Sequence, residues 1–521
     1  MKHKIIIKKN SYYDSISLMQ LSDKAKLLPN VLDAVISMGT ETNKNFLKEI
    51  NLFDQQLDAA GPNDLVIAIR IQDEQALESV SELIEKLLNS KESSEQKSTD
   101  DKPVSFDYTL RKNPDANIVL VSIPGEYAYY ESKKGLIADK HVMIFSDNVS
   151  IEQEIQLKEM AVSKGLLLMG PDCGTAIING VPLAFANVVP EGPIGIVGAS
   201  GTGSQQVSSL IARMGSGITQ LIGTGGRDLS EAGGGKMMLL GMKALNEDPK
   251  TKVIVLLSKP PAEVVMEKVL TSASKCTKPV VVCFLSGRKD VIEKYKLIAA
   301  DNLEEAATKA VQLATDKTIN VSIPEDELSA TGGLAEIETA KMNSNQKYIR
   351  GLYAGGTLCD ESIIYLRKIF GTIYSNTTID TERKLADSRI SVMDTIIDLG
   401  DDEFTKGKAH PMIDPSYRKL RLLNEAKDFE VAVILLDIVL GYGSHEDPAG
   451  AMLESIKQAK AEFENRGGYL SVVASVCGTE EDPQVLSAQE AKLKQVGVIC
   501  MPSNFQAVKL AAKIKEIVLK K

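Results

Sequence analysis

Short, uninterrupted apolar runs recur along this chain, and many of them end in a glycine-rich turn. The runs cover residues 118–123, 142–145, 166–169, 194–197, 218–222, 253–257, 280–285, 348–353, 395–399, 431–439, 469–475 and 496–500. A strand that is apolar on both faces belongs in a parallel sheet that helices cover on both sides. The sequence therefore predicts an α/β fold in which strands, glycine turns and helices alternate.

The chain is too long for a single core. It has 521 residues, whereas one hydrophobic core stops growing at roughly 250–300 residues. Polar stretches at residues 91–102 and 316–347 are interpreted as linkers or exposed loops. Before them, residues 4–8, 34–38 and 65–71 predict strands, and residues 14–28, 43–50 and 74–88 predict helices. We expect a small N-terminal α/β domain at 1–104 and larger α/β domains at 105–190, 191–318 and 346–521.

Charge and composition exclude several classes of protein. The net charge is −10, and no concentrated basic stripe is present to neutralise a phosphate backbone, which argues against nucleic acid as a partner. No apolar stretch approaches the roughly 20 residues that span a bilayer, and the apolar run after Met1 ends too early for a signal peptide. The six cysteines form no CxxC pair, which favours reduced thiols in a cytoplasmic protein without a membrane partner.

The clearest binding signal is the turn that follows the run at 194–197. Its residues Ser200, Gly201, Thr202 and Gly203 open a predicted helix. Free backbone N–H groups and the positive end of the helix dipole favour a phosphate or carboxylate there. The segment is not a Walker A loop, because no Lys-Ser/Thr follows it. The alternative interpretation is a tight strand-to-helix turn that requires small residues.

Four more glycine-dense turns stand where predicted strands end, which suggests a ligand lying across domains. They contain Gly125, then Pro171, Asp172 and Cys173, then Gly225, Gly226 and Arg227, and finally Gly355, Gly356 and Thr357. Arg227 is a candidate for a bidentate contact to phosphate or carboxylate, and a surface salt bridge to Asp228 or Glu231 is the alternative. Cys173 would act as a nucleophile only if its pKa were lowered, and a packing role is favoured.

An acidic segment and a histidine follow the strand predicted at 395–399. Asp398, Asp401, Asp402 and Glu403 are suited to Mg²⁺, with an exposed acidic loop as the favoured alternative. His410 is one of four histidines, and either an acid/base role or a structural one fits it. His445 is the second histidine candidate for such a role. Asp398, Arg227 and His410 are thus the candidates for catalysis.

Several of these segments resemble succinyl-CoA synthetases, and the closer resemblance is to the acyl-CoA synthetase-like FdrA family. The segments are 145–148, 169–175, 183–187, 198–203, 225–229, 258–263 and 410–415, and the similarity extends over nearly the whole chain. The resemblance implies a CoA-binding-like Rossmann domain at 105–190, a flavodoxin-like ligase domain at 191–318 and a ligase domain of β-subunit type at 346–521. It also implies a CoA contact at Gly125, Pro171, Asp172 and Cys173.

One departure from that family pattern concerns phosphohistidine. Synthetases carry Gly-His-Ala-Gly after a strand of the ligase domain, whereas this chain runs from 280–285 into Ser286-Gly287-Arg288 and has no histidine between His141 and His410. The resemblance then implies a subunit of a hetero-oligomeric oxamate carbamoyltransferase of allantoin breakdown, which converts carbamoyl phosphate and oxamate into oxalurate and phosphate. The alternatives are an acyl-CoA ligase that uses CoA and nucleotide, and a non-catalytic scaffold. A homodimer is also compatible with the sequence.

Overall fold

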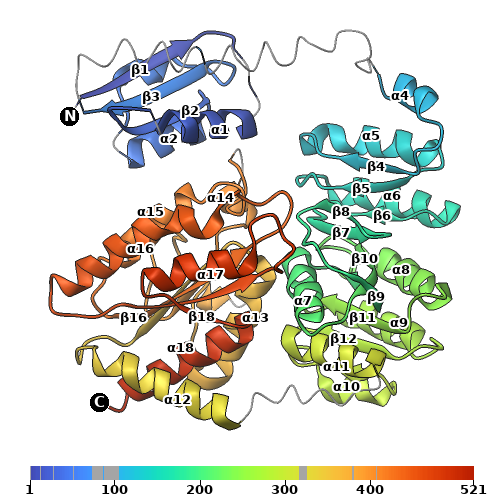
Figure 1. Ribbon diagram of the computed structural model, residues 1–521. Coiled ribbons are helices and arrows are strands. Elements are labelled where there is room, and N and C mark those ends of the chain that lie inside the picture. Colours follow the sequence, from blue (N-terminus) through green and yellow to red (C-terminus); the bar gives the residue numbers. More distant parts are fainter. Residues whose placement is uncertain are drawn as a thin grey trace. The chain divides into compact units, whose positions relative to one another are not determined.

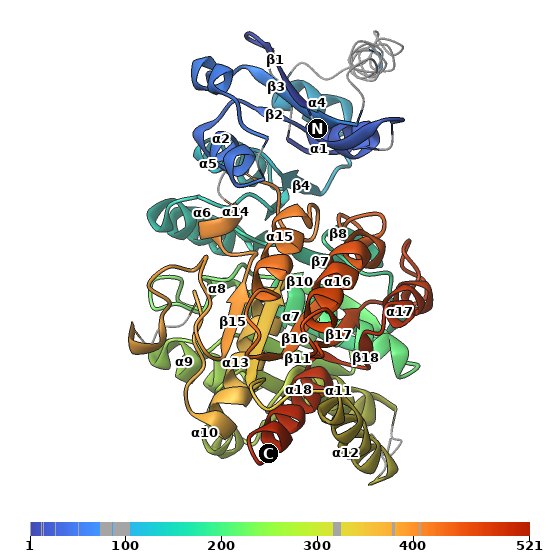
Figure 2. The same cartoon turned by 90° about the vertical axis from the view of Figure 1, so that its left-hand side faces the viewer.

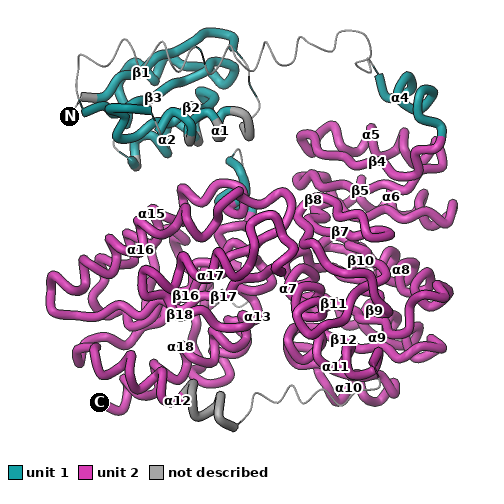
Figure 3. Tube along the Cα trace, viewed as in Figure 1, with its two compact units in different colours: residues 1–114, 402–410 teal, residues 115–401, 411–521 magenta. Residues whose placement is uncertain are grey.

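The protein forms two compact units. The computed structural model describes residues 2–11, 13, 15–26, 28–50, 52–72, 86, 105–315, 325–377, 381–405 and 408–521. The N-terminal unit comprises residues 1–114 and 402–410, and the main unit comprises residues 115–401 and 411–521 (Figure 3). The predicted linker at 91–102 and most of the predicted helix at 74–88 lie outside the described residues.

The N-terminal unit is built on an antiparallel sheet with the strand order β1-β3-β2 (Figure 1). Its elements are β1 (Lys2–Lys8), α1 (Ser15–Lys26), β2 (Val31–Met38), α2 (Glu41–Glu49), the 3-10 turn η1 (Gln55–Ala59), β3 (Leu65–Ile71) and α4 (Phe106–Lys112). Ile67 and Ile69 of the central strand pack with Leu18 and Leu21 of α1. The N-terminal unit thus contains both strands and helices, in the region where the sequence predicts a small α/β domain.

A three-stranded parallel sheet begins the main unit. It consists of β4 (Ile118–Val121), β5 (His141–Ile144) and β6 (Leu168–Met169), in that spatial order. The connecting helices are α5 (Gly125–Ile137) and α6 (Ile151–Lys164). Leu136 of α5 and Leu157 of α6 belong to the core of this sheet, together with Val142 and Ile144. The apolar runs at 118–123, 142–145 and 166–169 are confirmed as its strands.

The next sheet has seven strands in the order β13-β12-β11-β9-β10-β7-β8. The parallel strands are β9 (Glu191–Gly198), β10 (Ile218–Gly223), β11 (Val253–Ser258), β12 (Val280–Phe284) and β13 (Ile298–Ala299). The helices are α7 (Gly201–Arg213), α8 (Lys236–Glu247), α9 (Glu263–Ala273), α10 (Lys289–Lys294) and α11 (Leu303–Thr315). Strands β9 to β12 stand where the apolar runs predict them, whereas the two-residue strand β13 was not predicted.

An antiparallel hairpin that the sequence analysis missed closes one edge of this sheet. Strand β7 (Thr175–Ile178) pairs with β10, and β8 (Val181–Ala184) pairs with β7. Asn179 and Gly180 form its two-residue turn with positive φ values of 50° and 77°. Asn-Gly at such a turn is a strong hairpin signal, so the hairpin was accessible from the sequence.

The C-terminal sheet is parallel, with the order β15-β14-β16-β17-β18 (Figure 2). Its strands are β14 (Tyr348–Tyr353), β15 (Thr395–Asp398), β16 (Val431–Val439), β17 (Ser471–Cys477) and β18 (Ile499–Met501). The accompanying helices are α13 (Gly356–Phe370), α15 (Ser416–Glu425), α16 (Pro448–Glu464), α17 (Leu486–Gln495) and α18 (Asn504–Val518). Short helical turns occur at η3 (Thr381–Arg383) and α14 (Asp402–Thr405).

The prediction of a linker at 316–347 is wrong for about half of that stretch. Residues Glu325–Ala340 form α12, and Ala335 is fully buried. Glu338 near its end accepts hydrogen bonds from Ser471 Oγ at 2.8 Å and from Tyr469 Oη at 3.1 Å. Ala335 and Leu334 also pack into the core that the C-terminal helices share, and the stretch looked like a linker because these apolar residues follow no clear helical period.

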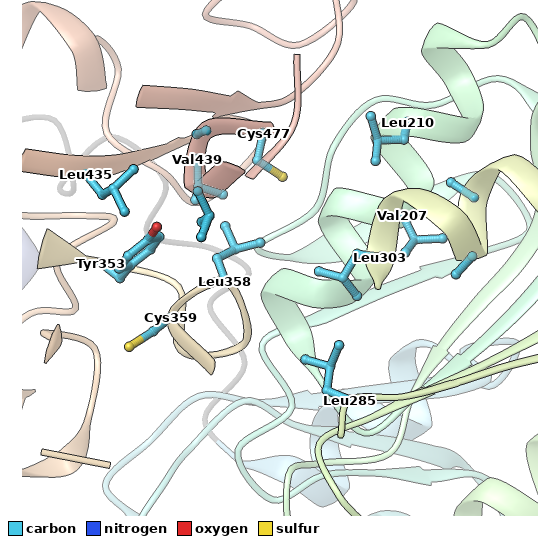
Figure 4. Packing of buried hydrophobic residues seen from close by; sticks show 14 of the residues in the cluster. Val207, Leu210, Leu285, Leu303, Tyr353, Leu358, Cys359, Leu435, Val439 and Cys477 are labelled. Atoms are coloured by element: carbon cyan, nitrogen blue, oxygen red, sulfur yellow. The ribbon is translucent and has the colours of Figure 1, made fainter. Parts of the chain in front are cut away.

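Helices α7 and α13 lie in a core that both large sheets share. One cluster of buried residues contains Val207 and Leu210 from α7, Leu358 from α13, and Leu435 from the C-terminal sheet (Figure 4). The glycine-rich turns at the start of these two helices are therefore carried by one continuous core. Among the described residues, no helix is long and apolar enough to cross a membrane.

Candidate anion-binding site

The start of α7 leaves backbone donors exposed to a ligand. Ser200 is the N-cap, and its Oγ accepts the Gly203 N–H at 3.1 Å. Within the described part of the chain, the N–H groups of Gly201 and Thr202 have no hydrogen-bond acceptor, as expected at the first turn of a helix. No acidic side chain stands in that turn. An anion would therefore meet free donors and the positive end of the helix dipole.

A buried carboxylate shapes the start of α13. Asp437 in β16 is fully buried, and its two oxygens accept the N–H groups of Ala354 and Gly355, each at 2.8 Å. Arg418 forms an ion pair with Asp437 at 2.6 Å and also donates to Leu352 O at 3.0 Å. Sequence reasoning missed Asp437, although it is the one charged residue inside the apolar run at 431–439.

The starts of α7 and α13 meet. Ser200 Oγ and Thr357 Oγ1 lie 2.6 Å apart. A Cβ atom on Gly203 would lie 2.9 Å from Thr357 Cγ2, and one on Gly355 would lie 3.0 Å from Thr202 Cβ. Only glycine lets the two turns come this close. The loops around 200–203 and 355–357, which the sequence predicted separately as binding phosphate or substrate, therefore lie against each other, and their binding of a ligand stays a prediction.

Opposite charges flank Gly356 at the edge of this site. A Cβ atom there would lie 2.5 Å from Asp398 Oδ2 and 3.7 Å from Lys259 Nζ. Lys259 follows β11, and its Nζ forms an ion pair with Asp360 Oδ2 at 2.7 Å. Sequence reasoning missed Lys259 and Asp360, although both lie one to three residues beyond a strand end or glycine turn.

The two charged groups have shifted pKa values. Burial raises the pKa of Asp398 to about 7, partly opposed by the nearby Lys259. Burial alone would lower the pKa of Lys259, but the carboxylates of Asp360 and Asp398 outweigh it and raise that pKa. Lys259 is therefore a fixed positive charge at neutral pH, while Asp398 can give or take a proton there. The side chain of Lys259 remains 44% exposed, so a ligand can reach it.

The turn with Gly225, Gly226 and Arg227 has other contacts. A Cβ atom on Gly225 would lie 2.4 Å from Pro171 O, so glycine is needed there for packing. Arg227 donates to Val149 O at 2.8 Å and pairs with Glu154 at 2.9 Å. Its guanidinium is thus engaged with α6, and neither Asp228 nor Glu231 is its partner in these contacts. The role of these three residues in binding phosphate stays a prediction.

The predicted CoA contacts lie in the turns that follow β4 and β6. A Cβ atom on Gly125 would lie 2.2 Å from Asp147 O, so this glycine permits a close backbone approach. Cys173 is 3% exposed, and burial raises its pKa to about 12, which agrees with a packing role and not with a nucleophile. Pro171 and Asp172 stand in the same turn. Contact of these residues with CoA stays a prediction.

His410 and the acidic segment do not form a recognisable metal site. His410 belongs to the N-terminal unit, and burial lowers its pKa to about 4, so the imidazole is neutral at pH 7. Among the described residues, no group of three or more His, Cys, Asp or Glu side chains is arranged to hold a metal ion. His445 accepts the Asp447 N–H at Nδ1, a local turn contact. The catalytic role of His410 stays a prediction.

Comparisons with known proteins agree with the α/β organisation. The family described as "CoA-ligase" matches residues 352–514, and the "CoA binding domain" matches residues 190–286. The latter range covers strands β9 to β12 of the seven-stranded sheet and the α7 turn, which the sequence analysis assigned to the ligase domain. The family "AllF, heavy metal-associated domain" matches residues 1–104. The main unit therefore combines CoA-binding and CoA-ligase modules, as in succinyl-CoA synthetase-like proteins.

The chain is also similar to several individual proteins. The chain is 46% identical over 504 residues to "Uncharacterized protein YahF" of Escherichia coli, with 97% of each chain covered. It is 25% identical over 187 residues to the ADP-forming sulfoacetate-CoA ligase subunit SauD of Bilophila wadsworthia, covering 34% of this chain and 61% of that protein. The dinucleotide-forming acetyl-coenzyme A synthetase 1 of Ca. Korarchaeum cryptofilum overlaps 78% of this chain and 85% of its own, at 15% identity and a TM-score of 0.32. So low a TM-score does not establish a shared arrangement of domains.

The heavy-metal description does not fit the residues of this chain. Residues 1–104 contain a single histidine, His3, three methionines and no cysteine, so they lack the thiolates that soft metal ions select. The connection between β1 and α1 is instead tied down by Asp64, which accepts from Asn10 N at 2.9 Å and Lys9 Nζ at 2.8 Å. We assign no metal to this domain.

Proposed function

The chain belongs to the same family as YahF of Escherichia coli, and from that premise we propose that it is a CoA-ligase-type enzyme subunit that handles an acyl phosphate. The phosphoryl group would bind at the start of α7, and the acyl group would pass between phosphate and the thiol of CoA. The observation that carries this proposal is the junction of two helix starts at Ser200 and Thr357, 2.6 Å apart.

The α7 turn supports the phosphate half of the proposal. The free N–H groups of Gly201 and Thr202 would donate to phosphoryl oxygens, and the helix dipole favours their negative charge. The start of α13 is less suited to the phosphate itself, because Asp437 already occupies the N–H groups of Ala354 and Gly355. The α13 side of the site would thus hold the group that receives the acyl group, which is the thiol of CoA.

Lys259 and Asp398 support the second half of the proposal, which is the transfer of the acyl group from phosphate to the thiol of CoA. In the forward step the thiol sulfur attacks the acyl carbon, the C–S bond forms, and the bond between that carbon and the bridging phosphate oxygen breaks. Asp398, with a pKa of about 7, would accept the thiol proton and return it to the released phosphate. Lys259 would stabilise the negative charge that develops on the leaving oxygen. No covalent attachment to the protein is needed.

A second candidate acceptor is oxamate, with carbamoyl phosphate as the acyl phosphate. One observation favours it: the chain has no histidine from residue 142 to residue 409, so the segment after β12, where synthetases carry their phosphohistidine, has no histidine to relay phosphate. Direct carbamoyl transfer needs positioning and anion stabilisation instead. The amide nitrogen of oxamate would form the new C–N bond, the bond between the carbamoyl carbon and the bridging phosphate oxygen would break, and the nitrogen's proton would leave with phosphate. Partner subunits are part of this second proposal.

Calorimetry with the purified chain tests both readings. We expect acetyl phosphate and carbamoyl phosphate to bind, and we expect CoA to bind if the first reading is correct. Phosphate release followed by ³¹P NMR, with either CoA or oxamate as acceptor, then separates the two readings. If neither acyl phosphate binds, the proposal fails and a scaffold role is favoured. The variant Lys259→Met should bind acyl phosphates more weakly, and thermal melting checks that it keeps its fold.

A further inference from the structure

Thr175 carries a buried hydroxyl without a protein partner. It is the first residue of β7 and is 2% exposed. Within the described part of the chain, its Oγ1 makes no hydrogen bond. A buried hydroxyl left unpaired costs free energy, so such groups in native proteins call for a specific explanation.

The hydroxyl lies beside the start of α7. A Cβ atom on Gly201 would lie 3.4 Å from Thr175 Oγ1, and Gly201 is the first residue of the helix. The unpaired hydroxyl of Thr175 therefore lies beside Gly201, the residue whose N–H begins the helix without an acceptor, although 26 sequence positions separate the two residues.

The backbone around Thr175 is held in place. Thr175 is paired with Ala184 in the hairpin, and the Cys173 thiol donates to Thr175 O at 3.5 Å. A Cβ atom on Gly223 would lie 2.3 Å from that same carbonyl oxygen, so β10 closes around it. A β-branched side chain has few χ1 rotamers, and the hydroxyl therefore has little freedom to turn elsewhere.

We propose that Thr175 is a ligand-contacting residue of the α7 site, whose hydroxyl donates a hydrogen bond to a phosphoryl oxygen of the acyl phosphate. This inference rests on the proposed function and adds a donor from a third element, β7, beside those of α7. A tetrahedral phosphoryl group presents oxygens in several directions at once, whereas a planar carboxylate presents two in one plane. Thr175 thereby favours phosphoryl over carboxylate ligands.

The substitution Thr175→Val tests this inference cleanly. Valine keeps the shape and the β-branch, which suits a strand, but it removes the hydroxyl. We expect inorganic phosphate and acetyl phosphate to bind at least tenfold more weakly to the variant, because a hydrogen bond to a charged oxygen is lost. Acetate binding should change less. Thr175→Ser, which retains the hydroxyl, should restore most of the phosphate affinity.

Calorimetry and thermal melting of the full chain separate the outcomes. Unchanged phosphate affinity in Thr175→Val would overturn the role of Thr175 and leave the α7 site standing. Equal losses in Thr175→Val and Thr175→Ser would also overturn it, because the hydroxyl would then not be the cause. No binding of phosphate or acetyl phosphate to the unaltered chain would overturn both this inference and the proposed function. If Thr175→Val melts early, Thr175→Ala provides the same comparison.

Discussion

Ser200 Oγ and Thr357 Oγ1 lie 2.6 Å apart although 157 positions separate them in the chain. Each hydroxyl belongs to a glycine-rich turn at the start of a helix, and each turn follows a strand of a different sheet. This contact brings the two turns together in one candidate site. The first two predictions concern this candidate site.

Thr357→Val should loosen the junction without removing the cap of α7, since Ser200 Oγ would still accept from Gly203 N. Ser200→Ala should remove both contacts and cost about 1 kcal/mol of helix stability. We expect the effects on phosphate affinity to be non-additive by at least about 0.5 kcal/mol, because the two residues touch. The four dissociation constants of a double-mutant cycle measure this, and strict additivity would contradict the junction. Thr357→Ser is the conservative control.

Gly356→Ala should impair acyl transfer more than phosphate binding. The new methyl group would collide with Asp398 Oδ2, which is 2.5 Å from the Cβ position, so the carboxyl must move away from the acceptor side. Phosphate affinity at α7 should stay within about threefold of the unaltered chain, a difference below 1 kcal/mol. Gly333→Ala in α12 is the matched control, because its Cβ would meet nothing within 4 Å. Equal activity in both variants would exclude Asp398 from the reaction.

Glu361 predicts a pH dependence of stability. It accepts from Leu303 N at 2.9 Å and Asn504 Nδ2 at 2.7 Å, and burial raises its pKa to about 7, above the roughly 4.3 of an unfolded chain. Between these values the folded chain binds more protons than the unfolded chain. The stability that this group contributes is therefore fully present below about pH 4.3 and is lost as the pH rises to about 7.

Calorimetric melting from about pH 5 to about pH 8 checks this prediction. Glu361→Gln removes the ionisation, so the difference in Tm between the variant and the unaltered chain should move in favour of the variant as the pH rises. Asp398 has a similarly raised pKa and will keep its own pH dependence in both proteins. A Tm difference that is flat across this range would show that Glu361 does not titrate there.

Lys158→Met should destabilise the main unit strongly. Lys158 is fully buried and pairs with Glu154 and Asp228, each at 2.8 Å, so its loss leaves the buried Asp228 without its cation and Glu154 with Arg227 alone. Removing one member of a buried pair costs about 3–5 kcal/mol. Lys134→Ala is the control, because its pair with Glu131 is partly exposed and should contribute about 0–1 kcal/mol. Urea midpoints measure both, and a similar shift in the two variants would contradict the prediction.

The N-terminal unit should not gain stability from copper or zinc. Residues 1–104 offer His3 and no thiol, so neither ion finds the ligands that it prefers. We expect melting of the full chain with and without Zn²⁺ or Cu⁺ to be the same for the unaltered chain and for His3→Ala. A metal-dependent rise in Tm that disappears in His3→Ala would contradict this.

The parallel sheets were predictable because their strands are buried on both faces and read as continuous apolar runs, of which Val431–Val439 is the longest. The hairpin β7–β8 was missed although its Asn179-Gly180 turn is a hairpin signal, because strands of four residues show too little alternation to be recognised beside a glycine-rich turn. Helix α12 was missed because its apolar residues, among them Leu334 and Ala335, show no clear helical period, and the polar contacts of Glu338 have no periodic signature.

The site was predictable only in its backbone. Glycine-rich turns indicate where two stretches of backbone can approach each other closely. The sequence therefore singled out the loops at 200–203 and 355–357 as candidates. Lys259 was not found, because its importance depends on where α13 lies, and sequence spacing does not say which helix starts face one another. Thr175 was missed for the same reason, since its hydroxyl matters only beside Gly201.

Both helix starts of the candidate site are carried by the same polypeptide. Contact between the two turns is therefore an intramolecular step. The effective concentration of one turn near the other is fixed and does not fall when the protein is diluted. The Ser200–Thr357 junction should assemble with first-order kinetics and persist at nanomolar protein, so any dependence of activity on dilution would report the dissociation of a further subunit and not the separation of these two turns.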